Sequence, residues 1–83
     1  MNRVLIKLYV PSIEEQYDIW IPLNKNIYTI ITMLTKAINE LTNNNYEPLH
    51  IPFIYNKVTG EKYDVNAIIN NTNIRNGTEL VLI

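Results

Sequence analysis

The chain has 83 residues, a length that suits one domain of modest stability, and it contains no cysteine for disulfides or a thiolate metal site. Hydrophobic residues make up 47% of the sequence and charged residues 18%, a balance that excludes an intrinsically disordered chain. Seven basic and eight acidic residues give a net charge of −1, so the sequence offers no basic surface for nucleic acid or an anionic membrane.

The N-terminal part of the sequence predicts a two-stranded hairpin. Residues 3–10 alternate between apolar and mixed side chains, as a half-buried strand does. Pro11 lacks an amide donor and ends this strand, and the polar stretch after it fits a hairpin loop. Residues 17–23 form the second strand, whose Pro22 places it at an edge of the sheet.

The strongest signal is one amphipathic helix after the hairpin. It begins at Asn24 or Asn26, since asparagine is a good N-cap, and runs to about Thr42. Several β-branched residues lower its intrinsic propensity, so packing must stabilise it. Apolar residues at i, i+3, i+4 and i+7 form one stripe that we interpret as core rather than as a binding groove: Ile27, Ile30, Ile31, Leu34, Ile38 and Leu41.

The remaining sequence predicts three short strands and no second full helix. A strand over residues 49–55 is followed by a turn and a short return strand over residues 61–64. Residues 65–73 are expected to form one or two helical turns. The Asn76-Gly77 pair predicts a tight turn with positive φ before the last strand, residues 78–83.

This order of elements predicts an α+β fold. One helix can cover only one face of one sheet, which excludes a ferredoxin-like sandwich with two helices. The first and last strands are the most apolar and are expected at the centre of the sheet. We therefore predict a single domain over residues 1–83, a β-grasp with one helix packed on a mixed five-stranded sheet.

The C-terminal part of the sequence resembles that of ubiquitin-like proteins. The ending IRNGTELVLI, residues 74–83, is similar to the apolar residue, short polar turn and final strand that close that fold, and residues 64–73 resemble its short helical turn. In element order and length the chain is most similar to the YukD-like bacterial family associated with type VII (WXG100) secretion. The resemblance implies noncovalent protein binding as an accessory or regulatory component, with a cytoplasmic domain of a membrane secretion component as the partner.

Two other β-grasp functions are alternatives. Conjugated modifiers and sulfur carriers end in a flexible Gly-Gly tail, whereas this sequence ends Leu82-Ile83, which disfavours covalent tagging and sulfur transfer. A nucleic-acid-binding β-grasp could stack bases on Tyr9, Trp20 and Tyr55. The sparse positive charge around these residues disfavours nucleic acid as a partner.

The sequence offers little for catalysis. His50 is the only histidine, and Ser12, the only serine, lies far from it in sequence. Glu14 and Glu15 are an adjacent acidic pair of the kind usually solvated in a loop, and no ligand spacing suggests a metal. We therefore predict a protein that is not an enzyme and that uses no cofactor and no metal.

The face of the sheet opposite the helix is the candidate site. Strand alternation turns several apolar residues away from the helix, and tryptophan and tyrosine are favoured in protein interfaces. Contiguous exposed apolar surface marks interaction sites, and the same surface could also mediate self-association. The predicted protein-binding residues are Leu5, Tyr9, Ile13, Trp20, Ile54, Val81 and Ile83.

The expected location is the cytoplasm, without membrane insertion. Arg3 and Lys7 interrupt the N-terminal apolar run, unlike the unbroken apolar stretch of a signal peptide. No stretch approaches the length of about 18 apolar residues that a membrane span requires.

Overall fold

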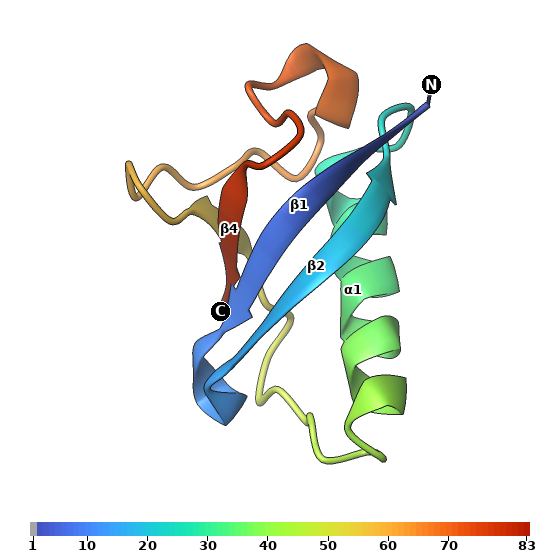
Figure 1. The fold of residues 1–83 in the computed structure, drawn as a ribbon, viewed down its shortest axis with the longest axis vertical. Coiled ribbons are helices and arrows are strands. Elements are labelled where there is room, and N and C mark those ends of the chain that lie inside the picture. The colour runs from blue at the N-terminus through green and yellow to red at the C-terminus, as the bar shows by residue number, and fades with distance from the viewer. Residues whose placement is uncertain (1) are drawn as a thin grey trace.

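The structure is a computed structural model that describes residues 2–83. One helix packs behind one twisted sheet, so the chain forms two layers (Figure 1). Two short 3₁₀ helices lie in the connections, at Pro11–Ile13 and Ile69–Asn71. The main elements are β1 (Arg3–Val10), β2 (Glu15–Pro22), α1 (Ile27–Leu41), β3 (Ile54–Asn56) and β4 (Glu79–Leu82).

The sheet is mixed and has the strand order β2-β1-β4-β3. β1 pairs with β2 in antiparallel and with β4 in parallel orientation, and β3 pairs with β4 in antiparallel orientation. The first and last strands are central and β2 is at an edge, as the sequence predicts. With one helix on one face, this arrangement is a ubiquitin-like β-grasp. Residues 2–83 contribute four strands to the sheet, so the predicted number of five is wrong.

The missing strand is the return strand expected over residues 61–64. This segment makes only an isolated bridge between Tyr55 and Lys62. A tight turn brings the chain back, with Gly60 at φ +78° donating its N–H to the Asn56 carbonyl at 2.8 Å. The chain then bends inward and buries the Tyr63 ring, so no ladder extends along β3.

The third strand is shorter than predicted, and its side chains point to the opposite faces of the sheet from those predicted. The sequence predicts a strand over residues 49–55, but β3 begins at Ile54. Ile54 pairs with Leu82, the last residue of β4, and Phe53 bonds to Ile83, so residues 49–52 have no residue of β4 opposite them. Ile54 lies opposite Leu82 and is completely buried, whereas Tyr55 lies opposite Val81 on the outer face. The predicted outward direction of Ile54 is therefore wrong.

The helix agrees with its prediction except at its last turn. Asn26 is the N-cap, and its side-chain oxygen accepts the Thr29 N–H at 2.9 Å. Leu41, predicted as core, is 64% exposed. The other five residues of the stripe are buried against the sheet: Ile27, Ile30, Ile31, Leu34 and Ile38.

Long-range hydrogen bonds position the ends of these elements. The first N–H groups of a helix lack partners within it, and here the Ala67 carbonyl accepts from Ile27 at 2.9 Å. The predicted turn at Asn76-Gly77 is confirmed, with Gly77 at φ +86°. Its N–H donates to the Leu5 carbonyl at 2.8 Å, which aligns β4 with β1. Within residues 2–83, no helix has the length and hydrophobicity that crossing a bilayer would require.

Candidate protein-binding face

The two faces of the sheet differ sharply in burial. Along β1, the even-numbered residues from Val4 to Val10 are buried under α1, while the odd-numbered residues point to the other side. Figure 1 shows that the helix lies behind the sheet and that no helix or strand covers the front. We call this uncovered side the outer face.

One end of the outer face carries a small apolar cluster around the only tryptophan of the sequence. Trp20 on β2 lies directly opposite Leu5 on β1 and is 46% exposed. The guanidinium carbon of Arg3 lies 5.2 Å from the centre of the Trp20 ring, within range of a cation–π interaction. We call Leu5 and Trp20 the Trp20 cluster.

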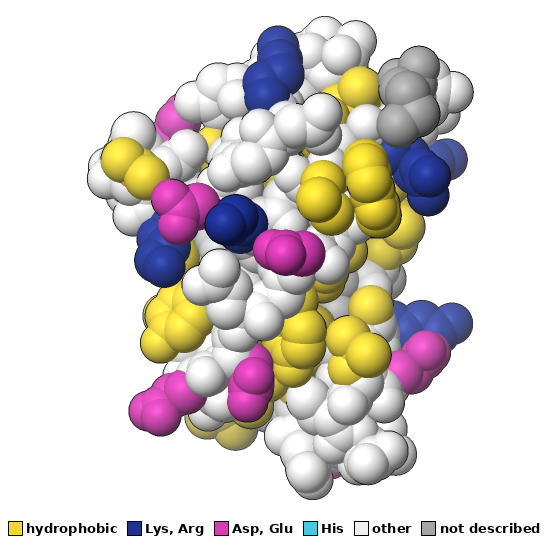
Figure 2. Space-filling model, in the orientation of Figure 1, with side chains coloured by type: hydrophobic (Ala, Val, Ile, Leu, Met, Phe, Trp, Pro, Cys, Tyr) yellow, Lys and Arg dark blue, Asp and Glu magenta, His cyan; other side chains and the backbone are white. Residues whose placement is uncertain are grey.

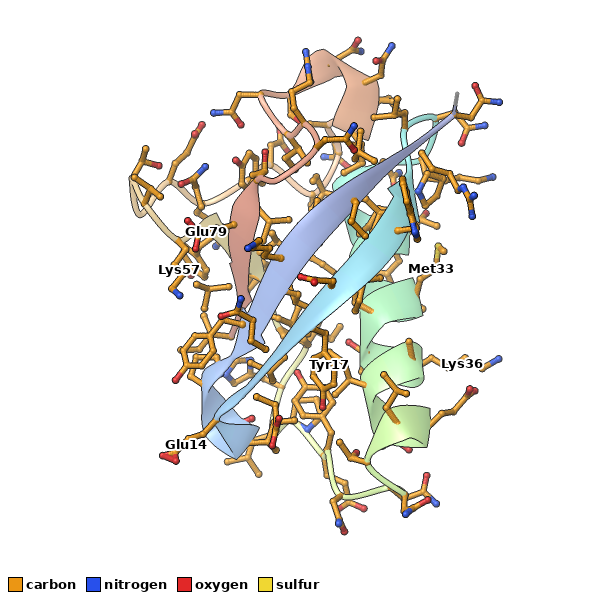
Figure 3. The ribbon with its side chains drawn as sticks, viewed as in Figure 1. Glu14, Tyr17, Met33, Lys36, Lys57 and Glu79 are labelled. Carbon is orange, nitrogen blue, oxygen red and sulfur yellow. The ribbon has the colours of Figure 1, made fainter. Side chains whose placement is uncertain are left out.

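A row of charges of alternating sign crosses the middle of the outer face. Lys7 on β1 lies opposite Asp18 on β2 and Glu79 on β4. The Nζ of Lys57 completes the row, 4.0 Å from Oε1 of Glu79. Figure 2 shows dark blue and magenta side chains across the middle of this view, and Figure 3 labels Lys57 and Glu79 beside β4. Exposed pairs of this kind add at most about 1 kcal/mol to stability.

The second apolar cluster lies beyond this row. Tyr9, Val81 and Tyr55 are adjacent across β1, β4 and β3. Phe53 and Ile83 adjoin them, joined by hydrogen bonds between their main chains at 2.9 and 3.0 Å. We call these five residues the Tyr9 cluster. Aromatic residues in register across strands give a rigid surface that loses little entropy on binding.

Basic groups surround the Tyr9 cluster. The Nζ of Lys57 lies 5.2 Å from the centre of the Tyr9 ring, and the Nζ of Lys62 lies 3.8 Å from the centre of the Phe53 ring. Together with His50 they border an open hollow of about 640 Å³, whose lining includes no carboxylate. The hollow therefore favours a partner that combines apolar and acidic groups.

The structure brings together five of the seven predicted binding residues, in two groups rather than one patch. Ile54 is in the core, so its place on the outer face is taken by Tyr55. Ile13, expected to extend the patch, is half-buried against the core in a 3₁₀ helix. The residues on the outer face are Leu5, Tyr9, Trp20, Val81 and Ile83.

The sequence interpretation missed Phe53, the lysines on the aromatic rings and the charged row. Their positions depend on strand register, and register beyond β1 and β2 is not visible in the sequence. Pro52 was the one available signal, because a proline inside the expected strand argues for a later start.

The side chains considered for catalysis do not converge. His50 lies in the exposed loop before β3, with its Nδ1 3.0 Å from the carbonyl of Ile51. Ser12 lies in the 3₁₀ helix after β1, and Glu14 follows at φ +52°. Within residues 2–83 no three His, Asp or Glu side chains gather as metal ligands would.

Comparison with solved structures gives ubiquitin-like domains. The EccD5 ubiquitin-like domain from Mycobacterium xenopi superposes with a TM-score of 0.79 at 16% identity, covering 100% of this chain and 94% of that one. The ubiquitin-like domain of the Mycobacterium tuberculosis type VII secretion system protein EccD1 gives a TM-score of 0.77 at 10% identity, covering 100% and 99%. A chain of the MycP5-free ESX-5 inner membrane complex gives a TM-score of 0.80 at 13% identity over 100% of this chain.

These likenesses establish the fold. The chain spans only 21% of the length of the ESX-5 component. No protein-family model matches the sequence, and no curated protein matches it. The structural neighbours include ubiquitin-like domains of type VII secretion systems, so they agree with the resemblance to a ubiquitin-like family tied to type VII secretion.

Proposed function

We propose that this protein is a non-conjugated ubiquitin-like protein that binds a protein partner noncovalently through the outer face of its sheet. Its role is accessory or regulatory in a type VII secretion system, and its partner is a cytoplasmic domain of a membrane component of that system. It acts in the cytoplasm, as a binding protein rather than an enzyme.

The observation that carries this proposal is the uncovered outer face. Two apolar clusters flank a charged row on a sheet that the helix leaves open, so hot-spot residues and orienting charges occur on one surface. The likeness to a chain of an inner membrane complex supports a membrane component as the partner.

A capture experiment tests the proposal. Tagged wild-type protein and the variants Trp20→Ser and Tyr55→Ser are used to capture partners from the native cell, followed by quantitative mass spectrometry. Leu49→Ser is the matched control, because Leu49 is a fully exposed apolar residue in the loop before β3. We expect one membrane secretion component to be enriched by wild-type and control proteins and lost with either variant.

The result would contradict the proposal in two cases. Equal enrichment by all four proteins would show that the outer face does not bind the partner. Enrichment of proteins unrelated to secretion, lost with the same two variants, would retain the binding face and remove the secretion role.

A further inference from the structure

The outer edge of β2 presents main-chain groups that the fold does not use. On β1, the Lys7 N–H donates to the Thr78 carbonyl at 3.0 Å, and the Leu5 carbonyl accepts from Gly77 at 2.8 Å. The odd-numbered residues of β1 therefore point their main-chain N–H and C=O groups toward β4, and the even-numbered residues point theirs toward β2. Since antiparallel pairing alternates along a strand, every second residue of β2 points its N–H and C=O away from β1.

These groups belong to Gln16, Asp18 and Trp20. Among the described residues 2–83, no other element provides them with a hydrogen-bond partner. β2 is the outermost strand, and Figure 1 shows no strand beside its outer edge. Pro22, which has no N–H, interrupts the edge only at the end of the strand. Donors and acceptors that repeat every second residue are complementary to an extended polypeptide strand.

Apolar side chains line the helix side of this edge. Tyr17 and Ile19 on β2 are half-buried against the core. Met33, Ala37 and Leu41 follow one another at four-residue spacing along α1, so they lie on one side of the helix. Met33 is 44% exposed, and Figure 3 shows Tyr17 between β2 and α1 and Met33 to the right of α1. Aliphatic side chains of an added strand would contact this surface.

The charge of this edge further restricts which polypeptide strand can bind to it. Residues 14–22 contain Glu14, Glu15 and Asp18 and no lysine or arginine. Asp18 has no ion-pair partner within 4.0 Å among the described residues. Pairing two copies of β2 edge to edge would bring two acidic strands together, which is unfavourable.

We propose that the free edge of β2 binds an extended segment of a partner protein as an added strand. That segment carries aliphatic side chains at every second position, facing α1, and lysine or arginine at the positions between them. The surface is distinct from the Tyr9 cluster, and the proposal does not depend on the proposed function of the outer face.

A peptide titration tests this directly. The ¹⁵N-labelled full chain is titrated with the blocked peptide Ser-Val-Lys-Val-Lys-Val-Ser. The peptide concentration reaches about 1 mM, which is high enough to detect weak binding. A matched peptide with glutamate in place of lysine is the control. We expect the amides of Gln16, Asp18 and Trp20 to shift and to gain protection from hydrogen exchange with the lysine peptide. The glutamate peptide should bind about two- to fivefold more weakly, from the effect of one facing charge.

Two variants separate the contribution of main-chain hydrogen bonds to peptide binding from the contribution of charge. Asp18→Pro removes the central edge donor while leaving the hydrogen bonds between β1 and β2 intact, so it should abolish binding. Asp18→Lys keeps the donor and reverses the charge, so it should bind the glutamate peptide better than the lysine peptide. Asp18→Lys also gives a result if the proline variant does not fold.

Three results would overturn the proposal. The first is no shift with either peptide. The second is shifts confined to the Tyr9 cluster. The third is concentration-dependent shifts along β2 without any peptide, which would make a second copy of this chain the occupant.

Discussion

The burial of Ile54 determines which side chains reach the outer face, and a pair of truncations tests it. Ile54→Ala removes three carbon atoms from a completely buried side chain. The loss of transfer free energy is about 0.8 kcal/mol per carbon, or about 2.4 kcal/mol in total, without any contribution from a cavity. A residual cavity raises the cost, within the range of about 2–5 kcal/mol seen for such changes.

This loss is large for a chain of 83 residues, whose total free energy of unfolding is about 4–12 kcal/mol. Urea unfolding followed by circular dichroism measures it, with the midpoint expected to fall by about 2–5 M at a slope near 1 kcal/mol/M. Ile54→Val provides a milder step of about 0.5–1.5 kcal/mol for the case in which the alanine variant is too unstable to study.

Ile83→Ala is the matched control, because it removes the same atoms from a side chain that is 56% exposed. We expect its cost to stay below about 1 kcal/mol. If the two alanine variants lost the same free energy, Ile54 would not be in the core. The register of β3 would then be shifted by one residue, and Tyr55 would not belong to the binding face.

Three further predictions concern other parts of the fold. Tyr63→Phe removes a hydroxyl that donates to Asn73 Oδ1 at 2.7 Å, and urea unfolding should show a loss of about 1–2 kcal/mol; no loss would mean that this bond does not form in solution. Asn26→Ala should cost about 1 kcal/mol in the same assay and Asn24→Ala almost nothing, because only Asn26 caps α1; the reverse order would place the cap at Asn24. Burial raises the pKa of the Tyr46 hydroxyl, so the folded state favours the neutral form of this side chain. The free energy of unfolding therefore includes a contribution from neutral Tyr46, which is lost as the pH rises through the raised pKa. Above about pH 10 the wild type should therefore lose stability more steeply than Tyr46→Phe in a pH series of unfolding curves, and parallel curves would contradict this.

The elements with strong local patterns could be predicted from the sequence. The spacing of apolar residues from Ile27 to Ile38 identifies the helix and its buried side, because a period of 3.6 residues has no other common cause. The alternation in residues 3–10 identifies β1 in the same way. The Trp20 cluster could be predicted because it lies on the two strands of the N-terminal hairpin, on the side of the sheet opposite the helix.

The region around β3 could not be predicted because its conformation depends on long-range contacts. Ile54 lies inward since it packs beside Leu82, a residue far away in the sequence. Tyr63 enters the core instead of extending a strand, and its hydroxyl bonds to two asparagine side chains. Neither arrangement leaves a periodic pattern, so the Tyr9 cluster was recognised only in part.

The most direct test of the account is to map the contact surface on the ¹⁵N-labelled protein with the captured secretion component added. We predict the largest chemical-shift changes at Tyr9, Tyr55, Val81 and the Trp20 indole, with the exposed side of α1 unaffected. Changes confined to α1 or to the loop before β3, with the Trp20 indole unmoved, would contradict a binding role for the outer face.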